Sequence, residues 1–488
     1  MFFYRLTISN VDYRIWRFNY FGIIPQHQVK TNGKKIRCHY CGIFAALELT
    51  KSAGLKILLL EKGKDIDQRH CPARDGSVCL SCSPCNLVCG LGGAGIYSDG
   101  KLVLSSQIGG QFEDYVEGKD AASLIKYVDD TYLKFGAPEN LYNVGAGADE
   151  IKRKAALGGM RLIPAPIRHL GTERSCMVLR AMRNSLDTRL DLKLDTMAAS
   201  IIVADGAVQG IETDDGERYL CEYLILAPGR EGSDWLSREG ERLGLTMQNN
   251  PVDVGVRVEV PAAVMESLTA AFYEVKLEYF SKSFHDRVRT FCMCPGGEVI
   301  MESTGGADPV ITVNGHSYSD RKTGNTNFAL LVSTDFTKPF HEPIAYGKYL
   351  ARLANILSGG VLVQRLGDLM QGRRSTPERI SSGLTEPTLK KATPGDLSFV
   401  LPYRHLTDLV EMLQAMDKLA LGVASEHTLI YGVEVKFYSC RPQLNPDLET
   451  EVANMFAVGD GTGVSRGLVQ ASASGVVAAH EILGRSGY

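Results

Sequence analysis

The sequence predicts an α/β fold in which segments from both ends of the chain build one domain and the segment between them builds a second. Two buried strands of the parallel type predict the first domain: residues 56–61, which follow a helix, and residues 455–459, which precede one. After residue 232 the pattern changes to longer strands mixed with helices. We therefore expect an inserted α+β cap or substrate domain at residues 233–445.

The composition is that of a globular protein and excludes several classes. The chain has 488 residues, 44% of them hydrophobic and 22% charged, which is enough for two or three structural units. A net charge of -3 gives no electrostatic footprint for nucleic acid. No run of about 18 apolar residues occurs, so we expect no membrane-spanning helix.

The use of cysteine predicts the compartment. Residues 1–20 are rich in aromatic side chains but lack the unbroken apolar core of a secretory signal. Twelve cysteines without such a signal indicate a reducing compartment, where thiols serve packing, metal binding or redox chemistry. We expect a cytoplasmic protein.

Changes of pattern along the chain predict the remaining boundaries. Residues 1–33 differ in composition and periodicity from the rest of the chain, and residues 105–164 have the pattern of a helical connection. We expect the first domain to consist of residues 34–104, 165–232 and 446–488.

A helix beginning at about Gly42 and the strand at residues 56–61 form the second half of a Rossmann-like βαβ unit. In such a unit, a carboxylate at the end of the second strand accepts hydrogen bonds from ribose hydroxyls. Glu61 lies nineteen residues after Gly42, close to the ~20 that the motif requires. Glu61 is therefore either a ribose ligand or a residue that closes a strand at the surface.

The first half of the unit departs from the pattern. A G-x-G-x-x-G turn ending at Gly42 needs glycines at positions 37 and 39, where the chain has Arg37 and His39. The glycines would let the turn close and bring the backbone near a pyrophosphate. The stretch before them, residues 32–36, has one apolar residue and predicts a poor first strand. An altered reading frame or start site upstream of Gly42 would produce this combination, and we favour that hypothesis over a new mode of binding.

A glycine-rich segment at residues 90–95 also matches G-x-G-x-x-G, but cysteines and polar residues precede it where a strand should be. We interpret Gly92, Gly93 and Gly95 as a loop whose backbone amides approach a flat or anionic ligand.

Four cysteines occur at the C-x2-C-x2-C-x3-C spacing of an iron–sulfur ligand run: Cys79, Cys82, Cys85 and Cys89. Gly90 follows the last one, where such runs usually have proline. A zinc site is an alternative, for which Cys71 could supply a thiolate. Redox-active thiols beside a cofactor, and thiols without any ligand, are the other two interpretations.

The C-terminal segment carries a stronger signal. Gly459, Asp460 and Gly461 end a buried strand, and a helix of small residues follows from Gly467. An aspartate there can accept a hydrogen bond from a ribityl hydroxyl, and the helix N-terminus can present amides to a flavin or pyrophosphate. Gly229 ends a similar strand, residues 223–227. The alternative is an ordinary buried terminal helix.

Polar clusters in the inserted segment are candidates for binding an anionic substrate or for acid–base chemistry. We single out His316, Arg373 and Arg374 as catalytic candidates. Each of them taken alone is more often a surface or interface residue.

Together, these segments resemble the FAD-dependent dehydrogenases related to the glutathione-reductase-like flavoproteins, over about residues 42–488. Five segments carry the resemblance: Gly42–Leu49, Gly92–Leu102, Gly372–Arg379, Gly432–Phe437 and Gly459–Gly461. No substrate follows from it.

The resemblance implies FAD bound in a Rossmann-like domain, with Glu61 on the ribose, Gly92–Gly95 beside the flavin, and Gly459, Asp460 and Gly461 as the C-terminal flavin motif. It implies no more than an FAD-dependent oxidoreductase. We expect this enzyme to transfer a hydride between a small molecule and the flavin. No second convincing Rossmann turn is present, so we expect NAD(P)H, if it is the reductant, to bind transiently. Two alternatives remain. One is a flavo-iron–sulfur electron carrier that uses Cys79–Cys89, and the other is a non-enzymatic thiol- or metal-binding protein that has lost FAD.

Overall fold

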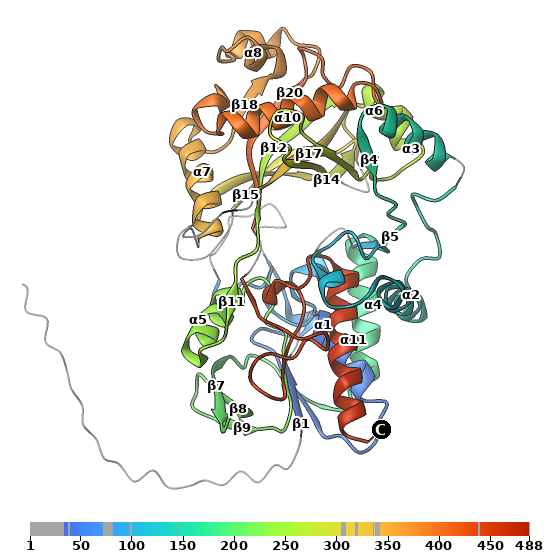
Figure 1. Cartoon of the computed structure of the whole chain (residues 1–488), viewed down its shortest axis with the longest axis vertical. Helices are drawn as coiled ribbons and strands as arrows, with labels where there is room; N and C mark the ends of the chain where they lie inside the picture. The colour runs from blue at the N-terminus through green and yellow to red at the C-terminus, as the bar shows by residue number, and fades with distance from the viewer. Residues whose placement is uncertain are drawn as a thin grey trace, which may run out of the picture.

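The computed structural model describes residues 34–37, 40–71, 82–97, 100–145, 147–303, 309–317, 321–334, 336, 342–437 and 440–487. Figure 1 shows two parts along the longest axis: a lower part that contains α1 and α11, and an upper part built on a large sheet. Cys79, His39 and the segment 1–33 lie outside the described residues.

A three-stranded parallel sheet opens the lower part, in the order β1 (Lys34–Arg37), β2 (Ile57–Leu60) and β6 (Asp191–Lys193). The sequence predicted a poor first strand, but β1 is present and pairs with β2 from Lys34 opposite Ile57. The prediction was wrong because strand pairing uses backbone groups, and β2, buried along its length, offers a full set of them.

Both ends of the chain meet in this part, which confirms the predicted fold class. Helix α1 (Tyr40–Leu49) packs against α11 (Leu468–Arg485), and strand β10 (Leu224–Leu226) pairs in parallel with β22 (Met455–Ala457). The two helices approach so closely that a Cβ on Gly475 would lie 2.0 Å from the Cys41 carbonyl oxygen. Only glycine fits at that crossing.

Two further helices complete the core of the lower part. Helices α2 (Gly118–Lys134) and α4 (Gly171–Leu186) share a hydrophobic core with α1 and α11 (Figure 1). An antiparallel meander follows, and α5 packs beside it. The remaining bounds are β3 (Lys101–Val103), β5 (Ile167–His169), β7 (Ala198–Ala204), β8 (Ala207–Thr213), β9 (Arg218–Leu220), α5 (Ser233–Leu243), β11 (Met247–Gln248) and β21 (Arg441–Pro442).

The upper part is built on an eight-stranded, mostly antiparallel sheet. Its order is β19 (Thr393–Pro394), β18 (Leu362–Arg365), β20 (Leu429–Lys436), β12 (Val252–Pro261), β17 (Asn325–Thr334), β14 (Arg287–Pro295), β13 (Leu277–Phe280) and β4 (Met160–Leu162). Strand β4 and helix α3 (Gly147–Leu157) come from the segment predicted as a helical connection, yet they pack into the core of this part. The predicted domain boundaries stay predictions.

The two faces of this sheet differ in chemistry. On one face, valines of β12 at alternate positions pack under α6 (Ala262–Thr269), α7 (Pro343–Ser358) and α10 (Tyr403–Met416). In Figure 1, α6 and α10 lie on the side away from the lower part. The other face is polar, since side chains alternate along a strand, and it carries Asp253 and Arg257.

A hairpin covers part of the polar face. It consists of β15 (Glu298–Ser303) and β16 (Ile311–His316). It lies so near that a Cβ on Gly315 would fall 1.9 Å from the Arg257 guanidinium. Among the helices that the structure describes, none is long and apolar enough to cross a membrane.

Candidate functional site

A cavity of about 790 Å³ is lined by both parts of the molecule. The lower part contributes a floor of glycines: Gly92, Gly93, Gly95, Gly109, Gly110, Gly229 and Gly467. The polar face of the large sheet and the segment leading into it contribute a charged roof: Arg161, Glu274, Lys276, Glu278, Arg287, Arg289 and Lys436. A site between two structural units is where ligand pockets are commonly found.

The floor is backbone held in conformations that other residues rarely adopt. Gly92, Gly93 and Gly110 have φ angles of 87°, 57° and 128°. A Cβ on Gly110 would also lie 2.5 Å from Cα of Ser465. At these glycines the backbone could approach a flat or anionic ligand closely, and the ligand-binding role of the 92–95 segment stays a prediction.

Two helices begin at the floor. Cys41, in the first turn of α1, lines the cavity, and so does the start of α11 from Gly467 to Ala471. Helix N-termini carry unpaired amides and a partial positive charge, which favours anionic groups such as a pyrophosphate. Residues 38 and 39, which precede α1 and include a predicted glycine position, lie outside the described residues.

Of the three residues of the predicted C-terminal motif, only Asp460 lines the cavity. Its Oδ1 accepts a hydrogen bond from Ser465 Oγ at 2.8 Å and its Oδ2 accepts one from Arg230 Nε at 3.2 Å. Gly459 and Gly461 are not among the described residues that line the cavity. A Cβ on Gly461 would lie 2.0 Å from the Gly229 carbonyl oxygen. Gly461 therefore allows the ends of β10 and β22 to come together beside Asp460.

A second cavity, of about 420 Å³, lies at the end of β2 and is lined by Glu61, together with Cys89 and Trp235. Glu231 lines both cavities. The Glu61 side chain is buried, and its Oε1 accepts hydrogen bonds from the amides of Gly63 at 2.9 Å and Gly90 at 3.0 Å. No described residue donates to its Oε2. One carboxylate oxygen is thus fixed by backbone while the other can accept from a ligand.

The described cysteines of the predicted cluster differ in burial. Cys89 is buried, and burial together with the nearby Glu231 carboxylate raises the pKa of its thiol to about 12. In this environment the Cys89 thiol is protonated at neutral pH and is a poor nucleophile. Cys82 is exposed and Cys85 partly buried, while Cys79 lies outside the described residues. Within the part of the chain that the structure describes, no group of three or more His, Cys, Asp or Glu side chains is placed to hold a metal ion.

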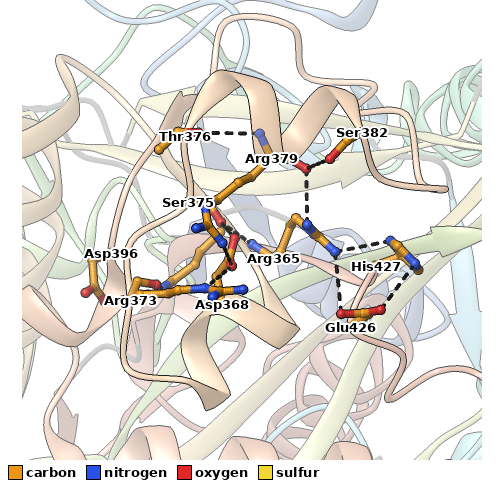
Figure 2. A network of polar contacts seen from close by, with 11 residues as sticks. Arg365, Asp368, Arg373, Ser375, Thr376, Arg379, Ser382, Asp396, Glu426 and His427 are labelled. Carbon is orange, nitrogen blue, oxygen red and sulfur yellow. Dashed lines mark hydrogen bonds and ion pairs between the residues drawn. The ribbon is translucent and has the colours of Figure 1, made fainter.

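The catalytic candidates from the inserted segment do not line the cavity. Arg373 instead donates from Nε to Oδ1 of Asp368 at 2.8 Å, in a network that joins α8 (Leu366–Met370) to α9 (Pro377–Ser381) (Figure 2). Arg379 Nη1 and Ser375 Oγ also donate to Asp368, at 2.9 and 2.8 Å. Burial would raise the pKa of Asp368, but these hydrogen bonds outweigh it and lower that pKa. The network holds the chain between the two helices.

The other two catalytic candidates are Arg374 and His316. Arg374 is exposed, and His316 ends β16 opposite Glu298. Asn314, two residues before His316, does line the cavity.

Sequence reasoning missed the charged residues of the roof. Arg287 and Arg289 stand at alternate positions of β14, with buried Val288 between them. This alternation, apolar on one face and charged on the other, is the signal of a half-buried strand and could have identified them.

Two models of known protein families match parts of the chain. Residues 251–437 match the family model described as "FAD-dependent protein, C-terminal domain-like", and residues 388–487 match that of glucose inhibited division protein A. These matches support an FAD-dependent oxidoreductase family for the chain. The resemblance seen in the sequence is thereby confirmed. An uncharacterized protein of Clostridium beijerinckii (strain ATCC 51743 / NCIMB 8052) is 29% identical over 476 residues, covering 91% of this chain and 79% of the relative.

Solved structures show weaker likenesses, each covering 93% of this chain. Quinol fumarate reductase of E. coli has a TM-score of 0.41 at 12% identity, over 70% of its chain. L-proline dehydrogenase of P. horikoshii has 0.39 at 10%, and glycine oxidase of Geobacillus kaustophilus has 0.37 at 13%, each over 94% of its chain. At TM-scores this low they carry no argument about the site.

Proposed function

We propose that the protein is an FAD-dependent dehydrogenase that transfers a hydride between a small molecule and the flavin. The observation that carries this proposal is the pair of cavities that meet at Glu231, one beside a half-satisfied carboxylate and the other over a glycine floor. A dinucleotide has two ring systems joined by a pyrophosphate, and two adjoining cavities, the larger of them lined by two helix N-termini, suit that shape.

The described residues fit FAD in named places. Oε2 of Glu61 would accept from the ribose hydroxyls, since its Oε1 is already held by two backbone amides. The starts of α1 and α11 would face the pyrophosphate, and Asp460 would face the ribityl chain. The segment Gly92–Gly95 would lie against the flavin. When bound, FAD supplies the hydride-accepting ring that no side chain can replace.

The chain's own contribution is to bind and orient. The floor would hold the cofactor through backbone, and the roof lines the other side of the cavity. No observation on the described residues favours the iron–sulfur or non-enzymatic alternatives.

An absorbance scan of the purified chain, followed by denaturation and identification of the released chromophore, tests the proposal. We expect the flavin spectrum and release of FAD. A colourless chain that also fails to bind added FAD would contradict the proposal.

Glu61→Gln tests the ribose assignment. The variant keeps an oxygen for the Gly63 and Gly90 amides but replaces the second acceptor with a donor. We expect FAD affinity to fall about 10- to 100-fold, the loss of a hydrogen bond to a charged group, when FAD is titrated into the apoprotein. Glu150→Gln, on the exposed face of α3, is the control. Unchanged affinity in Glu61→Gln would remove Glu61 from the site.

A further inference from the structure

We propose that the roof is a receptor for a carboxylate group, and that the molecule which reacts with the flavin is a small organic carboxylate. This inference rests on the proposed function for its second half, since the flavin defines the reaction. The receptor itself is inferred from the roof alone.

Three arginines lie on one face of the large sheet. Glu278 of β13 lies directly opposite Arg289 of β14 and opposite Arg161 of β4 in the strand register. Residues opposite one another across antiparallel strands point to the same side, and Arg287 is two positions from Arg289. All four side chains line the cavity. Three guanidinium groups therefore share this face with Glu278 and with Asp253. Asp253 pairs with Arg289 at 2.9 Å, which leaves Arg161 and Arg287 to share Glu278.

The roof has a surplus of positive charge. Glu278 is paired with two guanidinium groups: Arg161 Nη2 lies 2.8 Å from its Oε2, and Arg287 Nη1 lies 3.8 Å from its Oε1. The Glu278 side chain is only 5% exposed, whereas those of Arg161 and Arg287 are 65% and 42% exposed. A single carboxylate cannot neutralise both cations, and both arginines line the cavity.

A second carboxylate repeats this arrangement. Glu274, which is buried, is paired with Lys276 and, at 3.8 Å, with Lys101 of β3. Burial would raise the pKa of Glu274, but the charges of Lys276 and Lys101 outweigh it and hold that pKa at about 2. Glu274 is thus ionised, and around these two glutamates four cations face two carboxylates.

The roof suits a carboxylate better than a phosphate. Phosphate sites are typically built from backbone amides at helix N-termini and in glycine-rich turns, and those lie in the floor. The roof consists of paired strands, whose amides are engaged in the ladder, so it offers side-chain cations. Guanidinium groups can bind two oxygens of a carboxylate or of a phosphate, so the lack of free backbone amides in the roof is what favours a carboxylate there. A carboxylate held there would lie across the cavity from the floor.

The experiment titrates the FAD-loaded protein with small anions while the flavin absorbance is followed. The probes are acetate, glycine and succinate, with succinamide as the uncharged analogue and inorganic phosphate as the other anion. We expect at least one carboxylate to perturb the spectrum with a dissociation constant in the millimolar range or below, and succinamide to have no effect. Equal binding of succinamide, tighter binding of phosphate, or no binding of any carboxylate would overturn the proposal.

Three roof variants test the receptor: two should weaken carboxylate binding, and one should strengthen it. Arg161→Met and Arg287→Met should each weaken carboxylate binding about 10- to 100-fold, because each removes a charge-assisted contact. Glu278→Gln should strengthen it, because it releases two guanidinium groups from their shared partner. Arg321→Met, which disrupts an ion pair with Glu298 away from the cavity, is the matched control. Weakening in all the roof variants alike would indicate a structural role only and overturn the proposal.

The two proposals can fail separately. If the chain binds no flavin, the same titrations are followed through the melting temperature of the chain. A rise with carboxylate that Arg287→Met abolishes would then support the receptor while the dehydrogenase proposal fails. If instead the protein binds flavin but no carboxylate changes its spectrum or its melting temperature, the receptor is rejected and the flavin proposal stands.

Discussion

The floor and the roof of the large cavity differ in the residues that line them. The floor is rich in glycines, of which Gly92 and Gly110 stand where a Cβ would meet another segment, and its pieces come from distant parts of the chain. The roof is made of charged side chains on and beside one antiparallel sheet. The requirement in the floor is therefore steric, while that in the roof is electrostatic. Substitutions in the floor should disturb assembly and cofactor retention, and substitutions in the roof should change which molecule binds.

The largest effect is expected where the floor is assembled, at Gly461. A Cβ there would lie 2.0 Å from the carbonyl oxygen of Gly229, so the ends of β10 and β22 would have to separate. We expect Gly461→Ala to lower the free energy of unfolding by about 4 kcal/mol and to release the flavin. Urea unfolding and the bound chromophore measure both.

Gly484 of α11 provides a matched control. No heavy atom lies within 4 Å of a Cβ placed on it, so Gly484→Ala should raise stability by up to about 1 kcal/mol through helix propensity. If Gly461→Ala were as stable as Gly484→Ala, the steric account of the floor would be wrong.

Behind the roof, a buried ion pair should give the next largest effect. Arg257 is fully buried, and its Nη1 lies 3.4 Å from Oε2 of Glu434. Glu434→Gln would leave the guanidinium without its carboxylate partner, and we expect a loss of about 3 kcal/mol in urea unfolding. Below the unfolding transition, the variant should still hold its flavin, because the floor is untouched.

Glu298→Gln removes a more exposed ion pair, with Arg321, and should change stability by less than about 1 kcal/mol. Loss of flavin from folded Glu434→Gln would show that floor and roof are not separable as we describe them.

The smallest effect concerns the contact that joins the helices below the floor. Glu48 of α1 accepts hydrogen bonds from Lys51, from Tyr127 of α2 and from His480 of α11. Burial would raise the pKa of Glu48, but these three partners outweigh it and hold the pKa at about 2. A carboxylate whose pKa is lowered by folding adds stability above its ordinary pKa, and that stability is lost as the pH falls.

We therefore expect Glu48→Gln to lower the free energy of unfolding by about 2 kcal/mol at pH 7, with the difference shrinking as the pH falls from about 4.5 toward 2. Urea unfolding at a series of pH values measures it. Glu150→Gln, which breaks an ion pair of the same spacing on the exposed surface of α3, should change nothing measurable. A deficit in Glu48→Gln that does not depend on pH would rule out the ionic account.

The elements that the sequence predicted best are those with an unambiguous local pattern. The strands at residues 223–227 and 455–459 are buried along their length, so apolar runs identified them, and helix α11 followed from its small residues. Glycine clusters and Asp460 identified most of the floor, because close backbone approach leaves a trace in composition.

The rest depended on tertiary context. Strand β1 forms on the backbone of β2 despite its polar sequence. Arg373 stands in a polar cluster that closes on Asp368, and such a cluster cannot be told from a binding site without its partner. The roof was missed for the opposite reason: charged side chains on a strand look solvent-facing until another part of the molecule lies across from them.

The pairing of α1 with α11 has a consequence for synthesis. The large sheet draws most of its strands from residues 252–436, so a ribosome releases them nearly consecutively and they can pair while the chain is still growing. Helix α1 emerges early but finds its partner only after Leu468 and the residues beyond it have appeared. Ile43 and Phe44 can pack earlier against α2 and α4, but the face of α1 with Ala45 and Leu49 stays without its α11 partners until translation is almost complete.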